Sequence, residues 1–371
     1  MRILIFSNIP SPYFVEYLNE LGKFCDEIVC VFERKKASNR DKSWDQINVV
    51  NFKYYFLKGI KIGAEESLSF GAKKYIKLYK NHTIIFANPT TPTGILGIRY
   101  CIRHKIPYCV QSEGGFARVG NDFKTKIKRY LFKDAALYLT GMTPSNDYFT
   151  AYGAPVEKVK QYPFSSLSEK DLIDKPISLD EKKTIKESLG ITNSKMILYV
   201  GSMIQRKGID ILLNAFKDIK NDVCLYCVGG APTDELSKII SENNIQNVTF
   251  IKHSNLETLK NYYKAADLFV LPTRYDTWGL VVNEAMSYGL PVITTDACVA
   301  GLELIENGKN GYVVKTESID ELKEAINNAL LNSDKNKMAK NNIEKIKNHT
   351  YETMAKVIFG HLSELNSNGQ D

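Results

Sequence analysis

The stretch Leu271–Met286, which reads LPTRYDTWGLVVNEAM, combines a strand end, a turn and a helix start. The apolar run Leu268–Leu271 stops at Pro272, which is typical of a buried strand in a parallel sheet. A helix is expected to begin near Gly279. Its N-terminus would offer unpaired backbone N–H groups and a positive dipole end, which favour a phosphate. The stretch therefore predicts an α/β fold with a phosphate-binding helix start.

Two carboxylates flank this predicted helix start. Glu284 lies inside the helix and could accept two hydrogen bonds from a vicinal diol, whereas Asp276, eight residues earlier, lies in the loop and could face a second polyol. One carboxylate for a ribose, one for a sugar and a helix end for the diphosphate between them describe a nucleotide-sugar site. The alternative is an ordinary helix with solvated acids. The mutual agreement of strand, turn, helix and paired acids favours the site.

The same stretch resembles the carboxylate pair of the retaining GT-B glycosyltransferases of family 4, in which two glutamates are separated by seven residues. The positions of Gly279, of Glu284-Ala285-Met286 and of the following Gly289–Ile293 match. Asp276 stands where the family usually has Glu, and its side chain is one methylene shorter. The resemblance implies contacts to the donor sugar nucleotide from Asp276, Trp278, Gly279, Leu280 and Glu284.

The length of 371 residues suggests about two domains, and strand and helix signals alternate in two blocks. Expected strands are Arg2–Ser7, Glu27–Phe32, Thr83–Ala87, Pro107–Gln111 and Leu137–Thr140, then Met196–Val200, Val223–Val228, Val248–Lys252, Leu268–Leu271 and Val292–Thr295. Expected helices of the first block are Phe14–Leu21, Gly71–Tyr79, Gly94–His104 and Lys124–Phe132. The irregular stretch Pro163–Pro176 separates the blocks, and three helical segments from about Ser318 onward end the chain.

Two doubly wound units joined by a polar linker imply a cleft between them, with ligands bound outside the carboxyl ends of the strands. We expect an N-terminal Rossmann-like domain over residues 1–165 that binds the acceptor. A second one, over residues 176–348, is expected to bind the nucleotide sugar. The resemblance implies that the last helix, residues 349–371, crosses back onto the first domain.

Composition is that of a globular protein, with 44% hydrophobic and 25% charged residues. No apolar run approaches the ~20 residues that span a bilayer, and Ile3–Phe6 is too short for a secretory signal. Seven widely spread cysteines fit reduced thiols better than a disulfide framework. Cys224 and Cys227 have redox spacing, but they fall within an apolar strand signal and are expected in the core. A cytoplasmic location follows as an expectation.

Positive charge is concentrated in the first half of the chain. The net charge is +7, yet residues 1–165 carry 25 Lys and Arg against 14 Asp and Glu. Lys124, Lys126, Lys128, Arg129 and Lys133 alternate with apolar residues at helical spacing. This pattern suits an anionic membrane surface on the inner face of the cell membrane, although the apolar stripe is equally the buried face of a Rossmann helix. Nucleic acid is not expected as a partner.

Two adjacent cations follow the strand Met196–Val200 and precede a helix expected over Ile209–Lys220. At such a turn, the planar guanidinium of Arg206 and the compact ammonium of Lys207 could neutralise a leaving diphosphate without a metal. The segment resembles the family's glycine-arginine strand end and lysine-glycine helix start. Gly201 and Lys207 match, Ser202 replaces the arginine, and Arg206 is its expected substitute. Solvated loop cations are the alternative.

Two weaker donor-side signals end the next strands. Gly229-Gly230 would let a backbone approach the nucleotide, or would simply form a turn. Lys252 and His253 follow the next strand, where the resembling proteins contact the base.

Glu113, Gly114 and Gly115 end another strand, and Glu113 is the expected acceptor-side polar residue. Glycines permit close backbone approach, and a carboxylate there could hold or deprotonate a sugar hydroxyl. The alternative is an ordinary loop acid. Pro12-Tyr13, after the first strand, resembles the first loop of some bacterial surface-polysaccharide enzymes, although prolines also simply stop strands and start helices.

The resemblance thus implies a retaining hexosyltransferase that moves a sugar from a nucleotide-diphosphate sugar to a hydroxyl of a glycan acceptor, expected to be lipid-linked. Lipopolysaccharide or capsule synthesis would be its setting, the departing phosphate would help take the acceptor proton, and no cofactor or metal is expected. The residues expected to be catalytic are Glu113, Arg206, Lys207 and Asp276. A catalytically silent GT-B binding module and a nucleotide-sugar epimerase remain alternatives. A dinucleotide oxidoreductase is disfavoured because no G-x-G-x-x-G follows the first strand.

Overall fold

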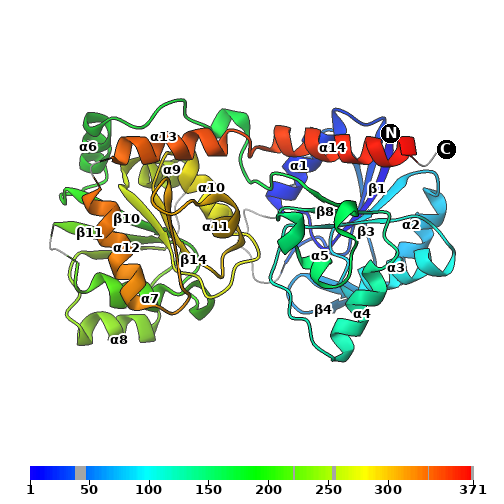
Figure 1. Cartoon of the computed structure of the whole chain (residues 1–371), viewed down its shortest axis with the longest axis horizontal. Coiled ribbons are helices and arrows are strands. Elements are labelled where there is room, and N and C mark those ends of the chain that lie inside the picture. Colours follow the sequence, from blue (N-terminus) through cyan, green and yellow to red (C-terminus); the bar gives the residue numbers. More distant parts are fainter. Residues whose placement is uncertain (38–46, 220–221, 253–255, 333, 369–371) are drawn as a thin grey trace. The chain divides into compact units, whose positions relative to one another are not determined.

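The computed structural model describes residues 1–37, 47–219, 222–252, 256–332 and 334–368. The chain divides into two compact units (Figure 1). Unit 1 comprises Met1–Ser166 and Thr350–Asp371, and unit 2 comprises Leu167–His349.

Unit 1 is built on a parallel sheet with the strand order β3-β2-β1-β6-β7-β8-β9. The strands are β1 Arg2–Ser7, β2 Glu27–Phe32, β3 Lys53–Phe56, β6 Thr83–Phe86, β7 Cys109–Ser112, β8 Leu137–Thr140 and β9 Val159–Gln161. The central strands are apolar along their length because both faces of the sheet are covered. In β1, for example, every residue after Arg2 is buried.

Most helices of unit 1 begin at a proline or after a capping side chain. The unit contains α1 Pro12–Gly22, α2 Ala72–Leu78, α3 Pro92–Arg103, α4 Phe123–Phe132 and α5 Tyr148–Ala151. Pro12 and Pro92 occupy the first turn, where their missing N–H costs nothing. The Thr91 side chain accepts a hydrogen bond from Gly94 N and caps α3. A small antiparallel hairpin, β4 Ile60–Ile62 and β5 Glu66–Leu68, lies outside the main sheet.

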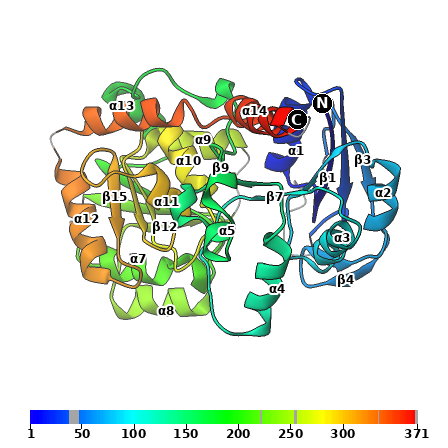
Figure 2. The same ribbon diagram turned by 45° about the vertical axis from the view of Figure 1, so that its right-hand side comes forward.

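The last helix, α14 Tyr351–Asn368, belongs to unit 1 and packs on α1. Its buried side chains, Met354, Ala355, Ile358 and Leu362, recur at helical spacing. Phe359 contacts Phe24, with ring centroids 5.5 Å apart. Figure 2 shows the red α14 alongside the blue α1. The expectation that the last helix returns to the first Rossmann-like unit is therefore confirmed.

Unit 2 contains a second parallel sheet with the order β12-β11-β10-β13-β14-β15. Its strands are β10 Lys195–Val200, β11 Val223–Val228, β12 Val248–Ile251, β13 Leu268–Leu271, β14 Val292–Thr295 and β15 Gly311–Val314. Its helices are α6 Leu179–Ser188, α7 Ile209–Phe216, α8 Asp234–Glu242, α9 Leu256–Ala265, α10 Leu280–Ser287, α11 Val299–Leu304, α12 Ile319–Leu331 and α13 Lys335–Ile346. Both units are thus Rossmann-like, as the sequence predicts.

The strand order of unit 2 reverses between β10 and β13. The chain runs from β10 outward through β11 and β12, then returns to β13 on the other side of β10. In open α/β sheets, ligands bind outside the carboxyl ends of the strands at such a switch point. The segments that leave β10 and β13 are residues 201–208 and 272–279, which carry most of the predicted donor residues.

Five strands are missing from the sequence-based prediction: the two short strands of the hairpin, β4 and β5, and three strands of the parallel sheets. The edge strand β3 is exposed along most of its length, β9 is three residues long, and β15 begins with Gly311. None of these shows the apolar run that marks a central strand. Helix α7 ends at Phe216, earlier than predicted; Lys220 lies outside the described residues. The linker 163–176, predicted to be irregular, contains a short 3-10 helix at Glu169–Asp171.

Candidate functional site

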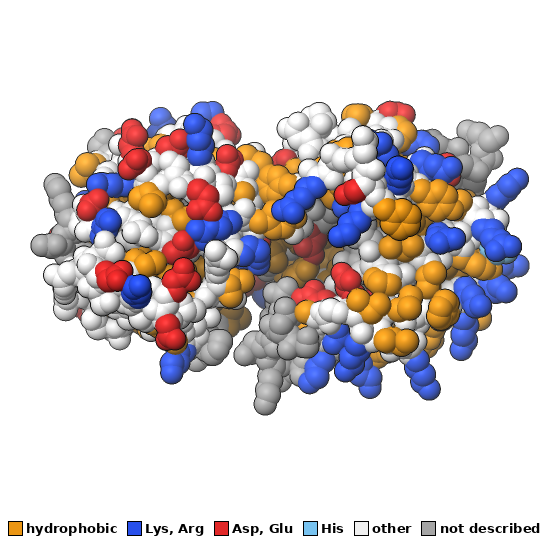
Figure 3. Space-filling view, turned by 90° about the horizontal axis from the view of Figure 1, so that it is seen from below, with side chains coloured by type: hydrophobic (Ala, Val, Ile, Leu, Met, Phe, Trp, Pro, Cys, Tyr) orange, Lys and Arg blue, Asp and Glu red, His pale blue; other side chains and the backbone are white. Residues whose placement is uncertain are grey.

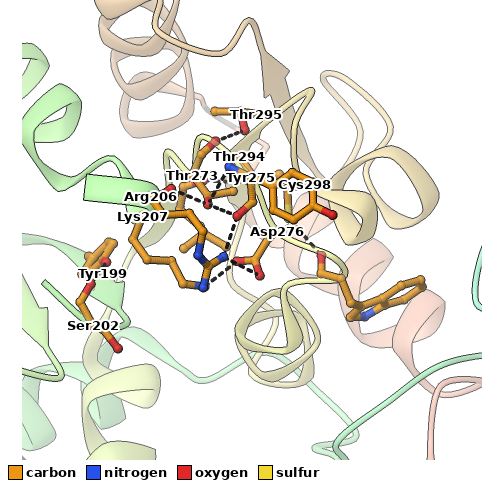
Figure 4. A network of polar contacts seen from close by, with 12 residues as sticks. Tyr199, Ser202, Arg206, Lys207, Thr273, Tyr275, Asp276, Thr294, Thr295 and Cys298 are labelled. Atoms are coloured by element: carbon orange, nitrogen blue, oxygen red, sulfur yellow. Dashed lines mark hydrogen bonds and ion pairs between the residues drawn. The ribbon is translucent and has the colours of Figure 1, made fainter. Parts of the chain in front are cut away.

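Two loops of unit 2 meet at the switch point between β10 and β13. Strand β10 pairs with β13, so the segments that follow them leave the sheet side by side. Arg274 N donates to Arg206 O at 2.8 Å, and the Thr273 hydroxyl donates to the same oxygen at 3.1 Å (Figure 4). The cationic turn and the carboxylate loop, predicted separately, are therefore one connected structure.

An ion pair between Lys207 and Asp276 lies at the centre of this structure (Figure 4). The Lys207 and Asp276 side chains are only 14% and 13% exposed. Arg206 Nη1 lies 3.4 Å from the other carboxylate oxygen of Asp276 and donates to Tyr275 O at 2.6 Å. Two cations thus surround one carboxylate and leave an excess positive charge, which suits an anionic ligand.

The Asp276 backbone is fixed by the segment that leads into α11. Asp276 N donates to Ala297 O at 2.9 Å, and Asp276 forms a parallel bridge with Cys298. Ala300 N donates to Trp278 O at 2.9 Å, and the Cys298 thiol donates to the same oxygen at 3.2 Å. Burial raises the pKa of Cys298 to about 11, so the sulfur stays a protonated donor.

Two glycines let the helix starts approach this centre. Gly208 precedes α7 with φ +70°, and a Cβ there would lie 1.9 Å from Pro272 O. Gly279 precedes α10 with φ +103°, and a Cβ there would lie 2.7 Å from Cys298 Sγ. Both positions combine a left-handed backbone with close contacts, so no other residue fits without rearrangement.

Trp278 supports the start of α10 from inside unit 2. Its side chain is 2% exposed, and the indole N–H donates to Asn283 Oδ1 at 2.8 Å. Asn283 is itself fully buried on α10. The Trp278 side chain therefore holds the loop against the helix. Its contact with a sugar nucleotide, which the resemblance implied, stays a prediction. Leu280, the first residue of α10, is half-buried.

Glu284, the second predicted carboxylate, lies half-buried on α10. Its Oε2 accepts a hydrogen bond from the Tyr263 hydroxyl at 2.8 Å. Tyr263 comes from α9, a different helix, and no spacing in the sequence indicates this pairing. It is a residue of the site that sequence reasoning missed.

Arg274 is a second missed residue, and it links three segments of unit 2. Its guanidinium forms a bidentate pair with Asp210, at 2.8 and 2.7 Å, and a further ion pair with Glu317. Nη1 also donates to Gln205 O at 2.6 Å. The Asp210 carboxylate, followed by Glu317, raises the pKa of Arg274 above its usual value. Arg274 therefore anchors the turn that carries Arg206.

The remaining predicted donor residues lie at the ends of β10, β11 and β12. Gly229 has φ +129°, and a Cβ there would lie 2.4 Å from Gly201 O, so these two strand ends approach backbone to backbone. Ser202 is exposed, and its carbonyl accepts a hydrogen bond from Tyr199 at 2.9 Å (Figure 4). Lys252 is exposed after β12, whereas His253 lies outside the described residues.

The predicted acceptor residues form their own cluster in unit 1. The Tyr13 hydroxyl donates to Glu113 Oε1 at 2.6 Å, although the two residues are 100 positions apart. Burial and the adjacent Glu113 carboxylate raise the pKa of Tyr13 well above its usual value, so the phenol stays protonated. Pro12 is exposed at the start of α1, and Gly114 and Gly115 are buried with φ +141° and +139°.

The chain is similar to known proteins in both sequence and structure. The model of the family described as "Glycosyl transferases group 1" matches residues 181–346, most of unit 2. The crystal structure of HepE from Anabaena in complex with UDP superposes on 98% of this chain and 100% of its own, with a TM-score of 0.77 at 18% identity. The chain therefore has the GT-B fold, and residues 181–346 match the glycosyltransferase family.

Curated relatives of this GT-B chain are similar over part of their length. An uncharacterised glycosyltransferase of Methanocaldococcus jannaschii is 32% identical over 177 residues, which are 46% of this chain and 44% of the relative. An uncharacterised protein in the cps region of Klebsiella pneumoniae is 29% identical over 229 residues, 59% of this chain and 58% of the relative. The chain thus spans about half the length of these relatives.

Helix α4 of this GT-B chain carries the basic stripe seen in the sequence. Lys124, Lys126, Arg129 and Lys133 are exposed. Of the apolar residues, Leu131 and Phe132 are buried, but Phe123 is 75% and Tyr130 40% exposed. In Figure 3, Lys and Arg side chains crowd the visible face of unit 1 among hydrophobic ones. None of the helices in the described part of the chain is long and apolar enough to cross a membrane.

Proposed function

We propose that this chain is a retaining glycosyltransferase that moves a sugar, of the hexose type, from a nucleotide-diphosphate sugar to a hydroxyl of a lipid-linked glycan. The setting would be the synthesis of a bacterial surface polysaccharide such as lipopolysaccharide or capsule. One observation carries the proposal: Arg206 and Lys207 converge on Asp276 directly before α10, the helix that bears Glu284.

The two cations would stabilise the charge that develops on the leaving diphosphate. Lys207 is held in place by Asp276, so its charge needs little reorganisation during the reaction. The Arg206 side chain is 46% exposed, so its guanidinium can turn toward a phosphate. The N-terminus of α10 adds the positive end of a helix dipole. Together these groups would serve in place of a metal ion, and no cofactor is proposed.

The carboxylates would orient the two ends of the donor. Glu284 would accept hydrogen bonds from the ribose hydroxyls, a contact that does not depend on the transferred sugar. Asp276 would contact a hydroxyl of the transferred sugar while it holds Lys207. Because Asp276 is one methylene shorter than the family's usual glutamate, it is the residue that we expect to influence the choice of sugar.

In the front-face mechanism that we propose, the acceptor oxygen attacks the anomeric carbon from the face that the diphosphate leaves, which retains the configuration. The bond between the anomeric carbon and the diphosphate oxygen breaks, and the bond to the acceptor oxygen forms on the same side. The hydroxyl proton passes to an oxygen of the departing phosphate. Positioning and charge stabilisation would therefore supply most of the rate enhancement.

The acceptor would be recognised by unit 1. Glu113, oriented by the 2.6 Å hydrogen bond from Tyr13, would hold or polarise the acceptor hydroxyl. The basic α4 would attract the anionic inner surface of the cell membrane, which fits a lipid-linked glycan and a peripheral, cytoplasmic location. The Klebsiella relative, which its description places in the cps region, supports the polysaccharide setting.

Calorimetry with UDP-, GDP- and dTDP-sugars tests the proposal. We expect at least one to bind to the wild-type chain, also in the presence of a chelator, and Lys207→Ala and Glu284→Ala to weaken that binding. Binding of none of them would favour a silent module. Conversion of the sugar without an added acceptor would instead identify an epimerase.

A further inference from the structure

The hydrogen bond between Tyr263 and Glu284 joins α9 to α10. The phenol donates to Glu284 Oε2 at 2.8 Å. Strand β13 and the whole carboxylate loop separate the two residues along the chain. The bond therefore exists only in the folded unit 2, where it acts on the carboxylate that the proposed function assigns to the ribose.

The Tyr263 ring is held rigidly. It is 2% exposed and stacks on Tyr288, with ring centroids 5.5 Å apart and an interplanar angle of 7°. Phe269 of β13 covers it at a centroid distance of 6.0 Å. A ring packed in this way cannot change rotamer without disturbing the core, so the position of its hydroxyl is fixed.

The hydroxyl also keeps its proton. Burial, and secondarily the Glu284 charge, raise the pKa of Tyr263 well above its usual value. The phenol is therefore a neutral donor at any physiological pH. It can donate a hydrogen bond to the Glu284 carboxylate without placing a second negative charge beside it.

Recognition of a vicinal diol demands such a fixed carboxylate. A glutamate has several rotatable bonds, and immobilising it at the moment of binding costs conformational entropy and so weakens the interaction. A carboxylate has about four sites that accept hydrogen bonds, so one bond from a phenol orients it without exhausting its capacity. A preoriented Glu284 can meet two hydroxyls at once.

We infer that Tyr263 is a positioning residue for the nucleotide: it holds Glu284 in the orientation that accepts hydrogen bonds from both ribose hydroxyls, and thereby makes the chain select ribonucleotides over 2′-deoxyribonucleotides. This inference rests on the proposed function, in which Glu284 binds the ribose. Tyr263 itself need not touch the ligand.

The test compares the dissociation constants of UDP with dUDP, and of GDP with dGDP, by calorimetry. For the wild-type chain we expect the ribonucleotide to bind roughly 10-fold or more tightly, because a hydrogen bond to a charged group is lost with the 2′-hydroxyl. Tyr263→Phe keeps the ring and its stacking but removes the hydroxyl. We expect the preference to fall to about 2- to 3-fold, because a Glu284 carboxylate that is no longer oriented forms a weaker hydrogen bond with the 2′-hydroxyl.

Tyr262→Phe is the matched control. It makes the same change one residue earlier on α9, where the ring lies against Tyr226 at 5.8 Å. We expect its nucleotide preference to equal that of the wild type. Melting temperatures of both variants separate folding from recognition, since a purely structural role would weaken both nucleotides equally and leave their ratio unchanged.

Each outcome bears on one claim. An unchanged preference in Tyr263→Phe, or a wild-type chain that binds both nucleotides equally well, overturns the inference and leaves the transferase proposal standing. Failure of the wild-type chain to bind any of the four nucleotides or dTDP contradicts the proposed function itself, whereas binding of dTDP alone overturns the inference.

Discussion

Lys207 and Asp276 form an ion pair although 69 positions separate them. The pair bridges the segments that follow β10 and β13, the strands at which the sheet order of unit 2 reverses. Both side chains are mostly buried, so their mutual orientation is fixed more firmly than that of a surface pair. Lys207, the proposed phosphate-binding cation, and Asp276, the proposed sugar-binding carboxylate, therefore hold each other in position.

Replacing Asp276 with Glu should change the choice of sugar more than the binding of the nucleotide. The longer side chain moves the carboxylate relative to the sugar, while Lys207 keeps a partner. We expect the ratio of kcat/KM between two donor sugars on the same nucleotide to change by about 10-fold, the effect of one altered polar contact. The affinity for the free nucleoside diphosphate should stay within about threefold. An unchanged ratio would show that Asp276 does not contact the sugar.

Arg274→Lys should loosen the turn that carries Arg206. A lysine cannot reproduce the bidentate pair with Asp210 together with the bonds to Glu317 and Gln205 O. We expect the free energy of unfolding to fall by about 1–3 kcal/mol and the affinity for the sugar nucleotide to fall several-fold. Urea denaturation and calorimetry measure the two effects.

Lys323→Ala is the control for this change, because it removes an exposed ion pair with Asp218 in the same unit. Such a pair contributes at most about 1 kcal/mol. If Arg274→Lys behaved like Lys323→Ala in both measurements, Arg274 would not anchor the turn.

Glu33 should make the stability of unit 1 depend on pH. It follows β2, is 5% exposed, and accepts hydrogen bonds from Ser67 N at 2.9 Å and from the Thr91 hydroxyl. Burial raises its pKa to about 7, whereas an unfolded glutamate titrates near ~4.3. The folded state therefore holds the proton more tightly, and this contribution to stability is lost as the pH rises from about 4.3 through 7.

Glu33→Gln removes that titration. We expect the variant to gain stability relative to the wild type between pH 5 and pH 8, measured as the difference in the free energy of unfolding in urea. Glu157→Gln, an exposed change in the same unit, should show the same pH dependence as the wild type. A constant difference between Glu33→Gln and wild type at both pH values would exclude this account of Glu33.

Helix α4 should bind anionic membranes. Changing Lys124, Lys126, Arg129 and Lys133 together to Ser removes four exposed cations, each of which contributes about 1 kcal/mol near an anionic surface. We expect at least a 10-fold loss of cosedimentation with vesicles of phosphatidylcholine and phosphatidylserine, and a smaller loss at high salt. As a control, Lys217, Lys238, Lys309 and Lys347 of unit 2 are changed to Ser. Equal losses in the two variants would mean that only net charge matters.

Local sequence signals predicted the backbone of the site well. The apolar run that stops at Pro272 marks the end of β13, and Gly279 marks the start of α10. These two signals place Asp276 in the loop and Glu284 on the helix, as in the structure. Gly208 likewise marks the start of α7 directly after Lys207. These features depend on neighbouring residues in the chain, which is why they are visible without a structure.

Partners from other elements could not be predicted. The bonds from Tyr263 to Glu284 and from Arg274 to Asp210 depend on how α7, α9 and α10 pack around the sheet. The hydrogen bond from the buried Trp278 indole to Asn283, five residues later on α10, was likewise not predicted. Tertiary packing decides these contacts, and one sequence does not record it.

The release of nucleoside diphosphate, with and without added glycan acceptors, tests the central claim most directly. UDP-, GDP- and dTDP-sugars are incubated with the wild-type chain, with Lys207→Ala and Glu284→Ala, and with the surface control Lys217→Ala. The account predicts release and retained anomeric configuration with the wild type and the control. It predicts at least a 10²-fold slower release with the two site variants, whose fold should remain intact. Release at wild-type rates from Lys207→Ala or Glu284→Ala would contradict it.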